Sequence, residues 1–447
     1  MSWLISLLIL CVTLGAQSTY YVDYVGGDDS NAGTEALPWK TSSKIGSGST
    51  TNDTVLLKGG VTLVCGATPI VLDSGQTLGA YGSGIPIVSA ATTVHCVQLD
   101  STTGVTIKDV KLTHSSAADA STGACIQAST SCNNLTVRGV TLYGGFAGFN
   151  CGNGITGTGN AFYGCFFELQ WTDGIDVRGT LDIVAYNCTF WRCGVPGDVG
   201  ASVNGPGDAI SSHQTGTFTA TECRIFSGAR SAGLSVHTAG TCTYTRCFVE
   251  TDDETDASGR YVFGMDGTGT MVVTNCVVLV TGTVEQYVFR SRNGGIMTVS
   301  HNTVLVTNTH ATTTVLLGTG ASSSVMTAKN NLIYAYAAGT TRLASSVEAG
   351  SLVSDYNCYF PTTGNRWGII GVFSTFAVWQ AATRDTNGIA ADPLVYNATS
   401  PTTVTDARLT AGSPCRGAGV DLSITVDIRN RGRGGFFDIG AWGRFFP

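Results

Sequence analysis

The sequence of 447 residues predicts an all-β solenoid, a parallel β-helix of ten or more stacked coils. Charged residues make up only 12% of the chain, and its 58 glycines lie among many Thr, Ser, Val and Asn residues, which favours strands and tight turns over helices. A strand-like segment recurs about every 27 or 28 residues. No helical periodicity separates these segments, so each repeat should form one coil whose strands stack in parallel sheets.

The first residues, MSWLISLLILCVTLGAQS, form an apolar run that ends in small residues. Ala16 and Ser18 are spaced as in the A-x-A site at which secretory signal peptides are cleaved. The run is shorter than the roughly 20 residues that a membrane span requires. We therefore expect a signal peptide over residues 1–18 and a secreted or cell-surface protein with no membrane span after cleavage.

The sixth position of the repeated segments forms a column of small or amide side chains. Stacked coils place equivalent residues about 4.8 Å apart along the axis. Cysteine suits such a column as a small hydrophobe, and asparagine suits it because its amide can hydrogen-bond to the next coil. The predicted column consists of Val110, Val140, Cys165, Cys188, Cys223, Cys247, Cys276, Asn302, Asn330 and Cys358.

This column accounts for much of the cysteine content. Of the 15 cysteines, one lies in the N-terminal apolar run and six lie in the column. No CxxC or HxxxH spacing points to a metal site. We expect mostly free, buried thiols, although one or two disulfide bridges could form among Cys65, Cys96, Cys125, Cys132, Cys151, Cys193, Cys242 and Cys415.

Segments at both ends of the chain point to a known family. YYVDYVGGDDSNAGTEALPWKT (20–41) resembles the N-terminal cap of secreted right-handed parallel β-helix proteins of the pectate-lyase-like superfamily. VSHNTV, VSDYNCYF and the stretch from ADPLV to FFDIGAWG (391–443) resemble their later coils and closing segment. The resemblance implies a cap over 19–52, a right-handed β-helix over 53–360 and a closing segment over 361–447. It implies no single activity, because the superfamily includes polysaccharide lyases, glycoside hydrolases, epimerases, adhesins and phage spikes.

A second strand in each coil indicates where function lies. Its first and third positions are apolar or small and should point inward, so the second and fourth face solvent. The aligned segments are VQLD (97–100), ITGT (155–158), IDVR (175–178), ISSH (210–213) and LSVH (234–237). This alignment places Asp100, Thr158, Arg178, His213 and His237 in one outward column, with Asp176, Ser211 and Ser235 beside them.

Further polar and aromatic residues should lie near this column. ELQWTDG (168–174) and GVPGDVGASVNGPGD (194–208) bring Trp171, Asp173 and Asp208 to the same edge. The second segment lengthens one coil to 35 residues, and a loop enlarged at one place on a regular scaffold tends to carry function. On later coils, we expect Arg290 and Arg292 to extend the positive edge and Phe263 and Phe289 to point outward.

The predicted function is β-elimination in an acidic extracellular polysaccharide. This reaction needs a cation to neutralise the uronate carboxylate, a base to remove the C5 proton and a donor to the leaving oxygen. Arg178 can supply the cation, alone or with Ca²⁺ held by Asp173, Asp176 or Asp208, and histidines that titrate near neutral pH can supply the base and the donor. The candidate catalytic residues are Arg178, His213 and His237, and the candidate substrate-binding residues are Trp171, Asp176, Arg290 and Arg292.

Two alternatives remain open, and one class of partner is disfavoured. A glycoside hydrolase would need two carboxyl groups about 5–9.5 Å apart, which Asp173, Asp176 and Asp208 could provide. A non-catalytic spike or adhesin could use the solenoid as a rod that binds carbohydrate. Nucleic acid is disfavoured because the net charge is −7, the pI is about 5.3 and RNRGRGG (429–435) is the one basic cluster in the sequence.

Overall fold

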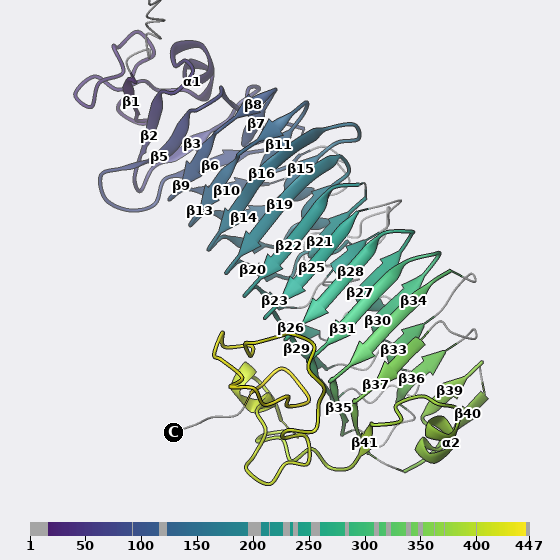
Figure 1. The fold of residues 1–447 in the computed structure, drawn as a ribbon. Coiled ribbons are helices and arrows are strands. Elements are labelled where there is room, and N and C mark those ends of the chain that lie inside the picture. The colour runs from purple at the N-terminus through teal and green to yellow at the C-terminus, as the bar shows by residue number, and fades with distance from the viewer. Residues whose placement is uncertain are drawn as a thin grey trace, which may run out of the picture.

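The computed structural model describes residues 17–443, except for residues 92, 116–122, 195–206, 214, 227–232, 236–239, 252–259, 282–285, 308–312, 319–322, 337–340, 347–351, 362, 371 and 399. Residues 1–16 of the predicted signal peptide and residues 195–206 of the enlarged loop (194–208) therefore lie outside the described residues. The described part of the chain forms three sheets of 13 strands each and one sheet of two strands. The strands stack into a long solenoid (Figure 1), and every strand pair is parallel except β39–β40. The fold is therefore the predicted parallel β-helix.

Sheet A forms the first face of each coil. Its strands alternate buried and more exposed positions: Phe218 and Ala220 are buried in Thr217–Thr221, whereas the three threonines of this strand are more exposed. This period of two buries one face of the sheet in the solenoid core. In stacking order the strands are β1 (Thr19–Val22), β2 (Thr54–Lys58), β5 (Thr77–Tyr81), β9 (Thr106–Lys108), β13 (Thr136–Arg138), β16 (Thr156–Tyr163), β19 (Thr180–Tyr186), β22 (Thr217–Thr221), β25 (Thr241–Thr245), β28 (Thr270–Thr274), β31 (Ile296–Ser300), β34 (Val325–Lys329) and β37 (Leu352–Asp355).

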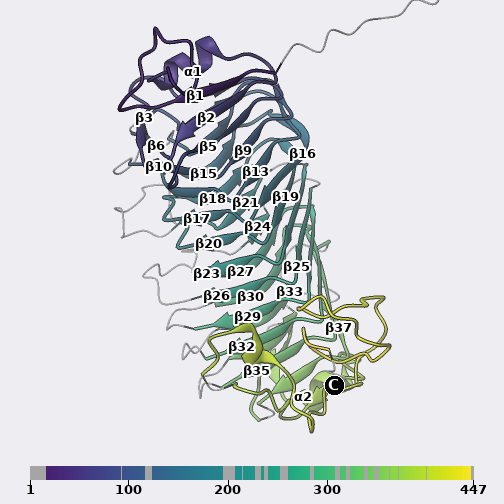
Figure 2. The same cartoon turned by 90° about the vertical axis from the view of Figure 1, so that its left-hand side faces the viewer.

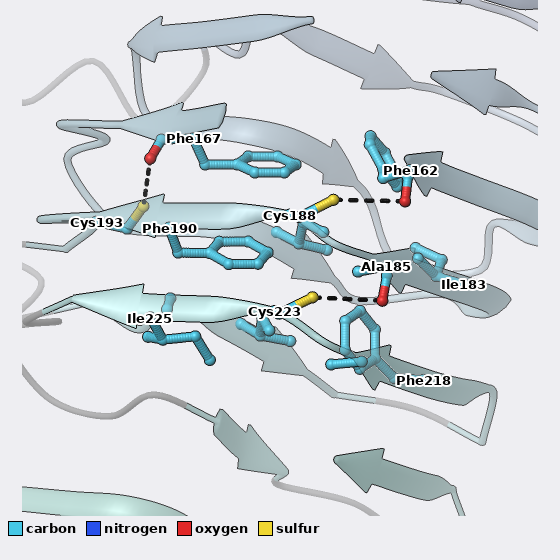
Figure 3. Close-up of a cluster of buried hydrophobic side chains, with 14 of the residues drawn as sticks. Phe162, Phe167, Ile183, Ala185, Cys188, Phe190, Cys193, Phe218, Cys223 and Ile225 are labelled. Carbon is cyan, nitrogen blue, oxygen red and sulfur yellow. Dashed lines mark hydrogen bonds between the residues drawn. The ribbon is translucent and has the colours of Figure 1, made fainter. Parts of the chain in front are cut away.

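Sheet B follows sheet A after a tight corner, and its inner face contributes stacked aromatic rings to the core. Phe167 and Phe190 stack at 4.6 Å between ring centroids (Figure 3). The strands of sheet B are β3 (Thr62–Val64), β6 (Ile87–Ala90), β10 (Lys111–His114), β14 (Thr141–Gly144), β17 (Phe166–Glu168), β20 (Thr189–Trp191), β23 (Arg224–Phe226), β26 (Phe248–Thr251), β29 (Val277–Val280), β32 (Thr303–Val306), β35 (Leu332–Ala335), β38 (Cys358–Phe360) and β41 (Ile389–Ala390).

Sheet C closes each coil and carries the strands on which the candidate site was predicted. Its inner column includes Ile175 and Ile210, which pair directly and are fully buried. The strands are β4 (Ile70–Leu72), β7 (Val97–Leu99), β11 (Ile126–Ala128), β15 (Ala147–Cys151), β18 (Asp173–Val177), β21 (Ile210–Ser212), β24 (Gly233–Ser235), β27 (Arg260–Asp266), β30 (Gln286–Arg292), β33 (Thr314–Gly318), β36 (Arg342–Ser346), β39 (Trp367–Ile369) and β40 (Val372–Ser374). The two-stranded sheet pairs β8 (Thr102–Thr103) with β12 (Cys132–Asn133).

The predicted cysteine column is confirmed for five consecutive coils. The registers of sheet A place Cys165, Cys188, Cys223, Cys247 and Cys276 at equivalent positions, and all five are buried. The thiols reach carbonyl oxygens of neighbouring coils, as Figure 3 shows for Cys188 and Phe162 (Sγ to O, 3.4 Å) and for Cys223 and Ala185 (3.4 Å). All fourteen cysteines of the described residues are buried free thiols, as predicted, and no disulfide joins them.

The last two members of the column were predicted wrongly by one residue. The sheet register places Asn331 and Asn357 in the column after Asn302, not Asn330 and Cys358. Asn330 instead occupies the corner after sheet A, where it has a φ of 57° in the left-handed region that asparagine tolerates. The side-chain amide nitrogens of Asn302 and Asn331 each donate to the next amide oxygen at 3.0 Å.

Both ends of the solenoid are covered. At the start, α1 (Ser42–Gly48) contacts β4, while Trp39 is buried and stacks on Tyr20 with ring centroids 4.2 Å apart. At the end, α2 (Phe376–Ala381) lies against β39, and β41 still pairs with sheet B. No helix among the described residues is long and apolar enough to cross a membrane.

The chain after Ala390 folds back along the solenoid. Residues 391–443, with η1 (Val404–Ala407), lie against the outer face of sheet B in the later coils (Figures 1 and 2). This outer face is apolar. It carries Val277, Leu279, Leu305 and Leu332, and the segment buries all four side chains fully. Its contacts with the described solenoid strands include the outer face of sheet B and the corner residues Asn275 and Asn330 that precede this sheet.

Candidate functional site

Polar side chains line the outer face of sheet C in register. Five consecutive strands place Gln98, Gln127, Asn150, Asp176 and Ser211 opposite one another. Asn150 donates from Nδ2 to Oε1 of Gln127 at 2.8 Å. This continuous outward column confirms that the second position of IDVR and ISSH faces away from the core.

Arg178 and His213 follow this column by two residues and pair as predicted. The backbone N–H of His213 donates to Val177 O at 2.7 Å, which fixes the two residues in adjacent coils about 4.8 Å apart. The side chain of Arg178 is 45% exposed and that of His213 is 32% exposed. The structure therefore presents a guanidinium and an imidazole together at the surface.

Asp176 and Ser211 hold these two groups in place from below. Nε of Arg178 donates to Oδ2 of Asp176 at 2.9 Å, and Nε2 of His213 lies 3.6 Å from Oδ1 of the same carboxylate. Ser211 Oγ lies 2.7 Å from Nε2 of His213. Ser211 and the carboxylate of Asp176 thus both face Nε2 of His213. In a nucleophilic triad, by contrast, the serine and the carboxylate bind opposite nitrogens of the imidazole. Ser211 is thus a positioning group.

Burial and charge set the protonation of this cluster. Burial lowers the pKa of His213 below its ordinary value of 6.5, Asp176 opposes that shift and Arg178 adds to it. Burial raises the pKa of Asp176, while Arg178 and His213 lower it. His213 is therefore a neutral imidazole at neutral pH, the form that accepts a proton.

Asp173 and Asp208 are stacked at the corner that leads into sheet C. The backbone N–H of Asp208 donates to Oδ1 of Asp173 at 2.8 Å. Burial, followed by the charges of Asp176 and Asp208, raises the pKa of Asp173 well above its usual range. The exposed fractions of Asp173, Asp176 and Asp208 are 6%, 0% and 4%, so these carboxyl groups do not reach the outer surface.

This burial bears on both roles predicted for the three aspartates. A hydrolase needs a carboxyl group that touches the glycosidic oxygen, which such buried groups do not offer. Among the described residues, no group of three or more His, Cys, Asp or Glu side chains could hold a metal ion. Calcium binding by Asp173, Asp176 and Asp208 stays a prediction.

Two of the aligned segments were placed wrongly. ITGT belongs to β16 of sheet A, and the sheet C strand of that coil is β15, so Thr158 lies on a different face from Arg178. The second misplaced segment is LSVH, which was aligned with Leu234 opposite Ile210. In the structure Leu234 pairs with Ser211, so LSVH is shifted by one residue relative to ISSH. His237 lies outside the described residues. The register therefore does not support the predicted equivalence of His213 and His237.

The aromatic predictions also need correction. Phe263 and Phe289 point into the core, where they are fully buried and stack at 5.7 Å between centroids, because they continue the inner column of Ile175 and Ile210. Trp171 is only 6% exposed, so its ring offers no platform for a sugar at the surface.

Arg290 and Arg292 do lie on the outer face of sheet C, as predicted. Arg290 stacks over Tyr261 and Tyr287, with its guanidinium carbon 4.5 and 5.2 Å from the two ring centroids. Arg292 forms an ion pair with Asp266. Arg290 lies in the same column as Asp176 and Ser211, on the fourth strand after the strand of Asp176. At 4.8 Å per coil, the backbone positions of Asp176 and Arg290 are about 19 Å apart.

The two tyrosines were not singled out in the sequence, although a signal was present. RYVFGMD (260–266) and QYVFRSR (286–292) share YVF 26 residues apart, which places both tyrosines at equivalent positions. Together with Arg290 they form an aromatic and cationic platform. We call the surface formed by Arg178, His213 and this platform, with Asp176 and Ser211 beneath it, the sheet C face.

Comparisons with known proteins agree with this fold. A family model described as the right handed beta helix region matches residues 95–250. Pectate lyase Pel9A is similar over 96% of this chain and 97% of its own, with a TM-score of 0.55 and 15% sequence identity. A rhamnogalacturonan lyase (73% of this chain and 85% of its own, 14% identity, TM-score 0.43) and PfbA, a surface adhesin of Streptococcus pneumoniae (68% and 87%, 10% identity, TM-score 0.42), are less similar.

No curated protein sequence matches the chain. At this level of identity, the likeness to Pel9A concerns the fold alone. The fold is nevertheless the one that the terminal segments implied, and it extends over almost the whole chain. The chain has a right-handed parallel β-helix fold, which it shares with pectate lyase Pel9A.

Proposed function

We propose that this chain is a secreted or cell-surface protein that binds an acidic polysaccharide along the sheet C face and cleaves it by β-elimination. The observation that carries the proposal is the exposed guanidinium of Arg178 beside the imidazole of His213, whose pKa is lowered. These groups supply two of the three requirements of the reaction on adjacent coils. The aromatic and cationic platform around Arg290 gives the same face a place to bind further sugar units.

In the proposed step, Arg178 pairs with the carboxylate of a uronate residue. A guanidinium binds a carboxylate through two parallel hydrogen bonds and stabilises the negative charge that develops when the C5 proton leaves. The imidazole of His213 accepts that proton. The electron pair of the C5–H bond forms the C4=C5 double bond, the C4–O bond breaks, and the leaving oxygen takes a proton from solvent.

Asp176 and Ser211 are positioning residues in this proposal. Asp176 accepts a hydrogen bond from Nε of Arg178, a contact that does not use the terminal nitrogens of the guanidinium. Ser211 fixes the ring of His213. Calcium remains a prediction that a chelator can test, and no part of the step depends on it.

A panel of purified polysaccharides tests the proposal. Wild-type protein would be incubated with polyuronates and with neutral glycans, with and without a chelator. Elimination leaves an unsaturated uronate that absorbs ultraviolet light, and we expect this absorbance only with polyuronates. New reducing ends without absorbance would indicate a hydrolase, and tight binding without any product would indicate a carbohydrate-binding rod. Either result would overturn the elimination proposal.

A further inference from the structure

A cavity of about 260 Å³ lies in the segment that covers sheet B, away from the sheet C face. It is lined by Arg408, Leu409, Ala411, Arg416, Asp438, Trp442 and Gly443. Typical pockets for drug-sized ligands measure roughly 300–1,000 Å³, so this cavity suits a smaller group. The proposed elimination does not use it, and its residues come from the C-terminal part of the chain alone.

Cations dominate the lining of this cavity. Arg408 and Arg416 are half-buried, and neither forms an ion pair within the described part of the chain. Arg416 donates from Nη1 to Ala411 O at 3.0 Å, which uses one of its five N–H groups. Arg408 stacks on Tyr396, with its guanidinium carbon 3.8 Å from the ring centroid. Stacking leaves the in-plane N–H groups of Arg408 available to a ligand.

Trp442 adds an apolar wall and brings further positive charge nearby. Its indole Nε1 donates to Val404 O at 3.1 Å, and the ring is 3% exposed. Arg429 and Arg431 lie over the same ring, at 5.5 and 5.2 Å from its centroid. Arg431 is paired with Asp427. The RNRGRGG cluster of the sequence is thus folded against the wall of the cavity.

Asp438 is the one carboxylate in the lining, and it is committed to the fold. It is fully buried, and its Oδ1 accepts a hydrogen bond from the backbone N–H of Gly417 at 2.6 Å. The lining therefore has a net positive charge from two guanidinium groups. Guanidinium groups bind carboxylates bidentately, and the indole ring of Trp442 and the aliphatic side chain of Leu409 line the rest of the cavity with apolar atoms.

We propose that this cavity is a second binding site, for the carboxylate-bearing sugar unit of an acidic polysaccharide. Arg408 and Arg416 bind the carboxylate, and Leu409 and the edge of Trp442 bound the rest of the cavity. A site at the C-terminal end of the solenoid, separate from the sheet C face, would tether a long substrate at two points and so raise its effective concentration at the first. The choice of sugar rests on the proposed function, whereas the binding site itself does not.

Calorimetric titration with a galacturonic acid trimer tests this proposal. The trimer is expected to bind wild-type protein at two sites and the Arg178→Ala variant at one. The double variant Arg408→Ala/Arg416→Ala should lose the other site, since loss of a charged hydrogen bond weakens binding by roughly 10-fold or more. Arg138→Ala is the matched control, because Arg138 is exposed and stacks on Tyr163 at 5.4 Å in the same manner as Arg408 on Tyr396.

The outcomes separate this proposal from the proposed function. Loss of one site in Arg408→Ala/Arg416→Ala but not in Arg138→Ala supports it, even if the sheet C face binds nothing. Unchanged stoichiometry and affinity in the double variant would overturn it. So would sulfate binding as tightly as the trimer, because the cavity would then be a general anion site. The variants Arg408→Lys and Arg416→Lys keep the positive charge, so they test whether weaker binding in the double variant comes from misfolding. Each should still weaken trimer binding, because lysine cannot bind a carboxylate bidentately.

Discussion

The imidazole of His213 is positioned by three neighbours, and each affects a different property. Ser211 fixes the ring, Asp176 opposes the lowering of the pKa of His213, and Arg178 adds to that lowering and offers a cation at the surface. The alternation of IDVR and ISSH predicted that these side chains share a face. It could not predict that Asp176 would be fully buried while Arg178 stays exposed, because that depends on how neighbouring coils cover the strand.

Replacing His213 by Ala should abolish most of the turnover with little loss of stability. Loss of a general base lowers turnover by roughly 10²–10⁴-fold. The folded state loses the hydrogen bond to Ser211, which costs about 1 kcal/mol. Steady-state kinetics on a polyuronate and thermal unfolding measure the two effects, with Thr219→Ala on the outer face of sheet A as the control. Wild-type turnover in His213→Ala would show that the imidazole is not the base.

The pH dependence of kcat/KM should report the lowered pKa of His213. The neutral imidazole is the active form, so activity is present above this pKa and is lost as the pH falls through it. Burial places the acid limb below pH 6.5. Asp176→Asn removes the carboxylate that raises the pKa of His213, so the acid limb should move to still lower pH. An acid limb at or above pH 6.5, or one that Asp176→Asn leaves in place, would contradict this assignment.

At the scale of strands and turns, the repeat predicted most of the architecture. The cysteine column was placed correctly over five coils because each of these five segments carries a cysteine at its sixth position. The prediction failed at Asn330 and Asn331, where two adjacent asparagines suit either the left-handed corner or the column. It failed again at LSVH, where apolar alternation fits two registers that differ by one residue. Phe263 and Phe289 were misplaced through the same ambiguity.

The thiols of the described residues should be inaccessible to reagents in the folded protein, because all fourteen are buried. Burial raises the pKa of Cys65 to about 12 and that of Cys132 to about 11, so neither forms the reactive thiolate at neutral pH. Denatured protein should therefore consume many more equivalents of a thiol reagent than native protein, without any reductant. Mass spectrometry of the labelled protein measures this difference. Equal labelling of native and denatured protein would mean that the cysteine column is accessible or already oxidised.

At the scale of the whole molecule, the C-terminal segment completes the core. The side chain of Arg433 is 2% exposed, and its Nη2 donates to Asn275 Oδ1 at 2.8 Å, which links the segment to a corner of the solenoid. The resemblance of ADPLV to FFDIGAWG predicted a closing segment. It did not indicate which face is covered, because that depends on contacts between residues more than 100 positions apart, such as Asn275 and Arg433.

Deleting residues 391–447 should destabilise the protein and make it aggregate. The deletion exposes Val277, Leu279, Leu305 and Leu332, and each such side chain contributes about 1.5–3 kcal/mol when buried. Thermal unfolding and light scattering of the truncated and full-length proteins measure the effect. A truncated protein that stays monomeric with the same melting temperature would show that the segment is not part of the core.

The most direct test of the sheet C face as the active site is kcat/KM of the Arg178→Ala variant on a polyuronate. Arg224→Ala is the matched control, since Arg224 is exposed on the outer face of sheet B. Removing one group that stabilises developing charge lowers the rate by roughly 10²-fold or more. We predict a loss of this size in Arg178→Ala, partial recovery in Arg178→Lys and wild-type values in Arg224→Ala. Equal kcat/KM in Arg178→Ala and Arg224→Ala would contradict the assignment of the active site to this face.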